Sequence, residues 1–204
     1  MNRSETTAET LLTGKAIAGH LEALASLRLD IFREYPYLYR GRREDELTYL
    51  ASYAEKPEAC VIIVEDGGGV IGAATGMPLR HEGASLRDPF TETACPIDDI
   101  YYVGELLFRP GYRNRGLGRR LLAQMESHIR SLGGFRKITC ATVERLDDHP
   151  LRPENDIPIS RFLACTGFAR LTGVTTHFTW LETDGIKRDH IMQFWMKDLP
   201  EAGD

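Results

Sequence analysis

The sequence predicts a mixed α/β (α+β) domain built around one sheet, and three observations indicate it. Two amphipathic, helix-like segments precede a pair of apolar, hairpin-like segments. The strongest strand pattern is followed by a long amphipathic helix, and two strands close the chain. The predicted order is α-α-β-β-β-α-β-α-β-β. At 204 residues a single domain is the default, and we find no internal repeat.

The spacing of apolar residues defines the elements of the first half. From Ala16 to Ile31 they recur every three or four residues, which is typical of one helix face, and Pro36 follows the end of that helix. A glycine-rich turn separates two apolar runs and predicts a hairpin. In order, we expect a helix from residue 16, a helix over 44–54, strands over 60–64 and 70–77, and a long loop over 81–99.

The second half contains the strongest strand, residues 100–108, which Pro110 ends. The next helix starts near Gly116 and stops at Gly133, a residue type favoured just after a helix. The remaining elements are a strand over 137–143, a loop over 144–158, a helix over 159–166, and strands over 174–181 and 190–196. We therefore predict a flexible N-terminus over 1–15, one domain over 16–199, and a tail over 200–204.

Charge and composition exclude several classes of function. Asp and Glu number 30 against 25 Lys and Arg, a net charge of -5. An acidic chain with no long basic block is a poor nucleic-acid binder. Apolar runs such as 61–64 are far too short to span a membrane, and the N-terminus has no signal-like apolar stretch. We expect a cytoplasmic protein with neither a nucleic-acid nor a membrane partner.

The four cysteines are widely spaced and form no CxxC pair, so we expect no disulfide framework and no metal site. Cys60 and Cys140 lie in strand-like runs and are expected to be buried. For Cys165 a core position is favoured over a chemical role.

The segment Arg-Asn-Arg-Gly-Leu-Gly-Arg-Arg, residues 113–120, lies between a strand and a helix. A helix N-terminus already carries about half a positive charge, so clustered cations there are unfavourable unless an anion binds among them. Gly116 and Gly118 allow close backbone approach and leave amide N–H groups pointing outward. The segment therefore indicates a phosphate cradle. The alternative is a solvated, arginine-rich helix start with Gly116 as its N-cap.

Two common nucleotide motifs fit this segment poorly. No Gly-Lys-Ser/Thr follows, as a Walker A loop requires. A dinucleotide fingerprint needs a glycine where Leu121 stands and an acidic residue about twenty positions further on, near the basic Lys137.

Arg113, Gly116 and Gly118 match in full the pattern Arg/Gln-x-x-Gly-x-Gly/Ala, and through it the chain resembles the GCN5-related N-acetyltransferase (GNAT) superfamily. Tyr112 before the motif, a Gly-Phe pair after the last helix and the order of elements agree over residues 16–199. The resemblance is to a bacterial-type member. It implies a single domain with a central, mostly antiparallel sheet of about six to seven strands, splayed between the fourth and fifth, and about four helices.

The resemblance also implies acetyl-CoA as co-substrate, with its pyrophosphate on the backbone amides of the motif. The pantetheine arm would lie beside the fourth strand, which in the family carries a bulge. A backbone N–H of Leu106 or Leu107 would polarise the thioester carbonyl there. The coenzyme residues so implied are Leu106, Leu107, Phe108, Arg113, Asn114, Arg115, Gly116, Leu117, Gly118 and Arg119.

Glu105 is the first candidate for a catalytic base, because it is the only acid in the apolar strand 100–108 and desolvation would raise its pKa. A salt-bridged or solvent-facing glutamate is the alternative. The family's frequent acid, a tyrosine four residues before the Gly-Phe pair, is replaced by Leu163. Tyr102 and Tyr112 are substitute candidates, and water or no acid at all are further alternatives.

Asp147-Asp148-His149, followed by prolines, forms a second cluster. His149 is a candidate acid/base and Asp148 a candidate for binding an ammonium group, with a solvated loop as the alternative. Tyr37 lies where the family tends to build an acceptor wall, and core packing is its alternative.

We therefore expect an acetyl-CoA-dependent N-acetyltransferase that moves the acetyl group directly from the thioester to a primary amine. Because Leu163 replaces the usual tyrosine, a non-catalytic acyl-CoA sensor is the alternative. The acceptor, a small molecule or a peptide amine, stays open, as do a longer acyl group and a homodimer.

Overall fold

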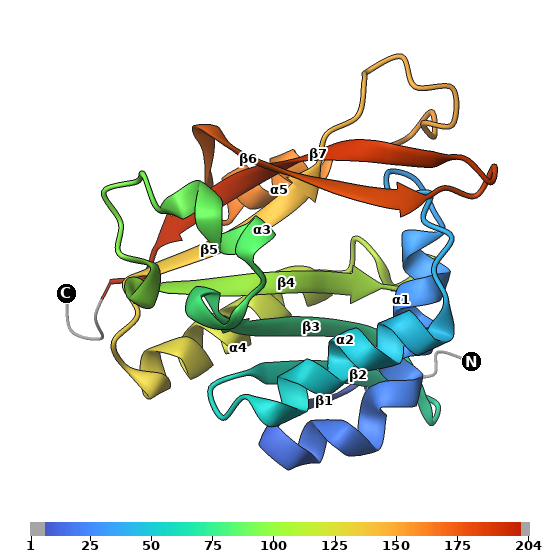
Figure 1. Cartoon of the computed structure of the whole chain (residues 1–204). Coiled ribbons are helices and arrows are strands. Elements are labelled where there is room, and N and C mark those ends of the chain that lie inside the picture. The colour runs from blue at the N-terminus through green and yellow to red at the C-terminus, as the bar shows by residue number, and fades with distance from the viewer. Residues whose placement is uncertain (1–6, 201–204) are drawn as a thin grey trace.

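The computed structural model describes residues 7–200 and shows one seven-stranded sheet with helices on both faces (Figure 1). The strand order is β1-β2-β3-β4-β5-β7-β6. Neighbouring strands are antiparallel except β4 and β5, which run parallel. The strands are β1 (Ala8–Thr13), β2 (Cys60–Asp66), β3 (Gly69–Pro78), β4 (Ile100–Phe108), β5 (Lys137–Val143), β6 (Ala169–Leu181) and β7 (Lys187–Asp198).

The helices bury apolar residues against the sheet from opposite sides. Leu27 of α1 and Leu50 of α2 are fully buried in one cluster, and Leu121 and Met125 of α4 are fully buried in another. Burying such side chains is the main stabilising term of the fold. The helices are α1 (Leu21–Phe32), α2 (Arg43–Glu55), α3 (Ala84–Arg87), α4 (Leu117–Leu132) and α5 (Ile159–Cys165). The predicted single α/β domain and its mixed sheet are confirmed.

The first strand is where structure and sequence analysis differ most. Residues 8–13, which we assigned to a flexible N-terminus, form β1 and pair with β2 from Ala8↔Glu65 to Thr13↔Cys60. Leu12 is the buried apolar residue of β1, so backbone pairing rather than an apolar pattern holds this edge strand. Residues 1–6 of the predicted N-terminus and 201–204 of the predicted tail lie outside the described residues.

Other elements differ at their ends. The predicted first helix begins as a 3-10 segment, η1 (Gly14–His20), before α1 starts. β6 begins at Ala169, earlier than predicted, and its register with β7 shifts between Arg170 and Thr175. The predicted loop over 81–99 contains α3 and short 3-10 turns.

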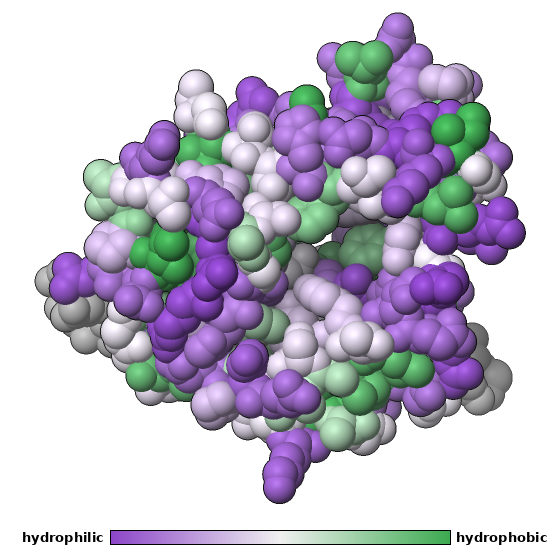
Figure 2. All heavy atoms as spheres, in the orientation of Figure 1, coloured by the Kyte–Doolittle hydropathy of each residue, from purple (hydrophilic) through white to green (hydrophobic). Residues whose placement is uncertain are grey.

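The centre of the sheet carries the bulge and the splay that the family resemblance implies. Thr75 pairs with Glu105 and Gly76 with Val103, so Gly104 bulges out of the β3–β4 ladder. Pairing between β4 and β5 spans three residues and ends at Tyr102. Beyond that point the two halves of the sheet diverge, and Figure 2 shows this face hollowed near its centre.

Candidate active site

The turn after β4 presents free backbone amides at the start of α4. Asn114 and Gly116 adopt the left-handed region, with φ of 60° and 80°. Glycine adopts this conformation without steric cost, and asparagine tolerates it. Gly116 is the N-cap, and no side chain of the described residues caps the helix. The first-turn N–H groups of this sixteen-residue helix can therefore bind an anion, aided by the helix dipole.

Gly118 lies where the start of α4 packs against neighbouring elements. A Cβ atom added there would lie 3.4 Å from the Phe162 ring of α5 and 3.6 Å from the Leu106 side chain of β4. One methyl group would fit in ordinary contact, whereas a branched side chain would crowd Phe162. A small residue here thus lets the start of α4 pack closely against α5 and the edge of β4.

The arginines of the motif have distinct partners. Arg113 donates to the Phe108 carbonyl at 2.8 Å and pairs with Glu34 at 2.8 Å, which fastens the turn to β4 and to the end of α1. Arg120 pairs with Glu9, the Arg115 guanidinium lies over the Tyr112 ring, and Arg119 is exposed. At least three of the four arginines therefore contact other residues of the fold, and the predicted cradle consists mainly of backbone amides.

Within the described part of the chain, Leu106, Leu107 and Phe108 pair with β3 along one edge of β4 only. Their other edge lies past the end of the β5 pairing. Such an edge can take an extended chain as an additional strand. The structure thus brings the predicted pantetheine residues and the predicted cradle to one place.

Glu105 is buried, and both carboxylate oxygens have partners. Arg28 of α1 contacts one oxygen and also pairs with Glu46 of α2, while Thr75 donates to the other. The Arg28 guanidinium lies 4.4 Å from the centre of the Tyr49 ring. These are the contacts of a salt-bridged glutamate, which is the alternative interpretation that the sequence left open for Glu105. Glu105 as a base stays a prediction and requires one contact to break.

Two tyrosines that the sequence analysis did not single out lie against the bulge. The hydroxyls of Tyr49 and Tyr53 are 2.8 Å apart, and Thr75 Oγ1 is 3.4 Å from that of Tyr53. A Cβ atom on Gly104 would lie 2.7 Å from the Tyr53 hydroxyl and 3.3 Å from that of Tyr49. The two tyrosines lie four residues apart on α2, as residues on the buried face of a helix do, so nothing in the sequence distinguished them from core residues.

Glu82, which follows the 3-10 turn η2 (Leu79–His81), is another residue that the analysis missed. Its side chain is buried, and its Oε1 has no hydrogen-bond partner among the described residues. Burial raises the pKa of Glu82 to about 7, against a hydrogen bond from the Gly83 backbone. Its charge in turn helps to raise the pKa of Tyr49, Tyr53 and Tyr102. Within a polar loop, nothing in the sequence marked it for burial.

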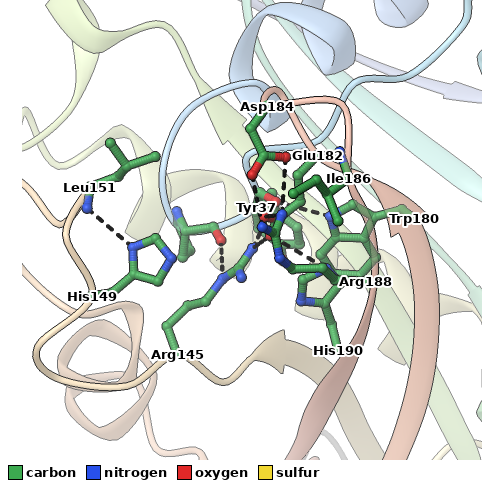
Figure 3. A network of polar contacts seen from close by, with 11 residues as sticks. Tyr37, Arg145, His149, Leu151, Trp180, Glu182, Asp184, Ile186, Arg188 and His190 are labelled. Carbon is green, nitrogen blue, oxygen red and sulfur yellow. Dashed lines mark hydrogen bonds and ion pairs between the residues drawn. The ribbon is translucent and has the colours of Figure 1, made fainter.

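The segment around Tyr37 is fastened to the β6–β7 hairpin (Figure 3). Arg145, whose side chain is nearly buried, donates to the Tyr37 carbonyl at 3.0 Å and pairs with Glu182 at 2.6 Å. The Trp180 indole donates to the same carbonyl at 3.0 Å. Burial is the main cause that raises the pKa of the Tyr37 hydroxyl to about 12, so it stays protonated near neutral pH. Tyr37 is thus half-buried in a fixed wall, which is consistent both with an acceptor wall and with core packing.

The predicted loop cluster lies beside this wall. His149 packs 5.6 Å from the Tyr35 ring, and its Nδ1 accepts from the Leu151 N–H at 3.2 Å. Asp148 is exposed, and Asp147 pairs with Arg152 at 2.8 Å. Glu105 contacts Arg28 of α1 and Thr75 of β3, and neither residue belongs to this loop or to the wall around Tyr37.

Three further residues concern the general acid, a role that the family often gives to a tyrosine at the position of Leu163. Leu163 is buried against the α4 side of the core. Tyr102 is buried, and its pKa is well above the usual value because of burial and neighbouring groups that include Glu82. The prediction of a core position for Cys165 is wrong: it is exposed at the end of α5, a helix too short to cover it.

Other features of residues 7–200 lie apart from this site. A cavity of about 360 Å³ lies near the start of β5, lined by Cys95, Lys137 and Met196 among others, and none of its lining residues belongs to the candidate site. Among the described residues, no helix is long and apolar enough to cross a membrane. No group of three or more metal-binding side chains is assembled within the same residues.

The chain is similar to known proteins of one family. The family model described as "Acetyltransferase (GNAT) family" matches residues 22–150, which is more than half of the chain. A search of curated proteins found no match.

Solved structures share the fold over nearly their whole length. A ribosomal-protein-alanine N-acetyltransferase from Brucella melitensis superposes with a TM-score of 0.60 at 15% identity, covering 93% of this chain and 99% of that one. A Salmonella typhimurium protein solved with its cofactor acetyl-CoA gives 0.59 at 15% identity, with 97% of each chain covered. An aminoglycoside N-acetyltransferase in complex with CoA gives 0.55 at 15% identity, with 82% and 90% covered. The chain therefore belongs to the GNAT family of acetyltransferases and is an acyltransferase.

Proposed function

We propose that the protein transfers an acetyl group from acetyl-CoA to a primary amine by direct attack of the amine on the thioester. One observation carries the proposal: the uncapped N-terminus of α4 lies next to the free edge of β4, just after the Gly104 bulge. This arrangement offers an anion site and an extended-chain site in the order that a pyrophosphate and a pantetheine arm require.

The residues present fit the coenzyme. Backbone amides from Asn114 to Arg119 would hold the pyrophosphate, and the absence of a side chain at Gly118 keeps the approach open. The edge of β4 at Leu106 to Phe108 would hold the pantetheine arm. The thioester supplies the activated acetyl group, and a backbone N–H of Leu106 or Leu107 would stabilise the charge that develops on its carbonyl oxygen.

The opposite side of the bulge favours a positively charged acceptor. Arg28 is the cation in contact with both Glu46 and Glu105, so these three side chains carry a net charge of about -1 when ionised. Such a site attracts an ammonium group. We assign Tyr37, Asp148 and His149 to the outer part of the acceptor site. The amine-acetylating neighbours named above are consistent with this acceptor class.

The test combines binding and turnover. Acetyl-CoA should raise the Tm of the protein through ligand linkage, and free thiol should be released with at least one member of a panel of cationic primary amines. A Tm that acetyl-CoA does not change would contradict the cradle. Binding of acetyl-CoA without thiol release from any amine would instead support the acyl-CoA sensor, for which Leu163 in place of a tyrosine is the observation in favour.

A further inference from the structure

Among residues 7–200, no ion pair compensates the buried carboxylate of Glu82. Its side chain is 9% exposed, and Oε1 lacks a hydrogen-bond partner among residues 7–200. Leaving a buried acceptor unpaired is costly, so such a group in a native fold needs an explanation. Two others nearby, Glu46 and Glu105, share Arg28. Glu82 differs from both because no cation acts on it appreciably.

The surroundings of Glu82 lead to the reaction centre. Its charge acts on Tyr49 and Tyr53 of α2 and on Tyr102 of β4. The hydroxyls of the two α2 tyrosines, 2.8 Å apart, lie against Gly104. Gly104 forms the bulge at which β4 leaves β5, and the acetyl group is expected there. The charge of Glu82 thus reaches hydroxyls that lie against the bulge, but no hydrogen bond joins its carboxylate to them within residues 7–200, so a proton relay requires a bridging water.

We propose that Glu82 is the catalytic base, which takes a proton from the acceptor ammonium through the hydroxyls of Tyr49 and Tyr53. The proposal rests on the acetyl transfer proposed above and deepens it. It places the base on the segment between β3 and β4 rather than at Glu105 of β4, whose two carboxylate oxygens already contact Arg28 and Thr75.

The proton balance follows directly. The acceptor arrives as an ammonium, and Glu82 takes its first proton, which later returns to solvent. The neutral nitrogen forms the C–N bond to the acetyl carbon while the C–S bond breaks. The nitrogen loses a second proton, and the departing thiolate takes up one. The products are an acetamide and a free thiol, with one proton released overall.

The protonation properties of the group suit this role. Burial raises the pKa of Glu82 to about 7, and the hydrogen bond from the Gly83 N–H opposes the shift. A base with a pKa near the working pH combines a useful ionised fraction with proton affinity. The three tyrosines on which the charge of Glu82 acts have raised pKa values, so they stay protonated and can relay a proton without losing their own charge state.

The experiment measures kcat against pH at saturating amine and acetyl-CoA for the wild-type protein and for Glu82→Gln. The wild-type profile should fall on the acidic side with an apparent pKa near 7. Glu82→Gln should lower kcat by about 10²-fold or more and remove that acidic limb. The Tm shift caused by acetyl-CoA should be unchanged. Glu92→Gln, an exposed glutamate of the same segment, is the matched control and should retain both rate and profile.

Two further variants test the relay. Tyr49→Phe/Tyr53→Phe keeps both rings but removes both hydroxyls, and it should lower kcat while leaving acetyl-CoA binding intact. Wild-type kcat in this variant would overturn the relay. If Glu82→Gln does not fold, Glu82→Asp serves instead. Its carboxylate lies one methylene further from the tyrosines, so kcat should fall while the acidic limb persists.

The outcomes separate the two proposals. A wild-type protein that turns over while Glu82→Gln, or its Asp replacement, keeps wild-type kcat and profile overturns the assignment of Glu82 alone. A wild-type protein that binds acetyl-CoA but releases no thiol with any amine overturns the acetyl transfer, and the assignment of Glu82 with it.

Discussion

Arg28 should be one of the most important polar residues for stability, because two buried carboxylates depend on it. The side chains of Arg28, Glu46 and Glu105 are 12%, 3% and 4% exposed. Arg28→Met fills a similar volume but leaves both carboxylates buried without a cation. Removing one partner of a buried ion pair costs about 3–5 kcal/mol. For a chain of this size that corresponds to a loss of roughly 6–20 °C in Tm.

Urea unfolding provides the measurement, with the midpoint expected to fall at a constant m-value. Arg43→Met is the matched control, because it breaks another ion pair between α1 and α2. In that pair the side chains of Arg43 and Glu22 are both more than 60% exposed. Exposed pairs contribute only about 0–1 kcal/mol. Adding Glu46→Gln and Glu105→Gln to Arg28→Met should restore much of the loss. If Arg28→Met costs no more than Arg43→Met, or the triple variant is no more stable than the single one, the reasoning is refuted.

The remaining predictions concern the cradle, the buried glutamate and the acceptor end. Gly118→Val should abolish the Tm increase caused by acetyl-CoA, because the methyl groups of valine crowd the start of α4. Gly19→Val, in an open and exposed position, is the control and should keep the increase. An unchanged Tm increase in Gly118→Val would remove the cradle assignment. The pKa of Glu82 rises on folding from 4.5 to about 7, so the folded state binds the proton more tightly than the unfolded state does. The resulting contribution to the free energy of unfolding is fully present below about pH 4.5 and is lost as the pH rises through 7. Relative to wild type, Glu82→Gln should therefore gain about 3 kcal/mol between pH 4 and pH 8, and parallel urea curves for the two proteins would contradict the raised pKa. Asp148→Asn and His149→Ala should raise the acceptor KM without changing acetyl-CoA binding, and steady-state kinetics in which acceptor KM and kcat both stay at wild-type values would make this loop a scaffold.

Local chemistry determined much of the proposed coenzyme site. The cradle follows from a few neighbouring residues: glycines at the start of a helix, a proline after the strand, and the strand itself. Backbone amides at a helix N-terminus form an anion site wherever the turn leaves them uncapped, so Gly116 and Gly118 could be interpreted from sequence alone. The periodicity of α4 and the apolar run of β4 likewise fixed the faces that those elements bury.

Tertiary structure decided which side chains share the proposed reaction centre. Glu105 was identified from its strand, but its partner Arg28 lies on a helix 77 residues earlier in the chain. The Tyr49 and Tyr53 hydroxyls reach the bulge only because α2 packs close to Gly104, and Glu82 is buried only because of how the segment after β3 folds. Burial and the proximity of charges set these properties, and both are created by contacts between distant segments. The sequence therefore determined most of the elements, though not β1, and the predicted phosphate cradle. Only folding decided the ionic partners and the buried carboxylate, because desolvation depends on what the whole chain places around a group.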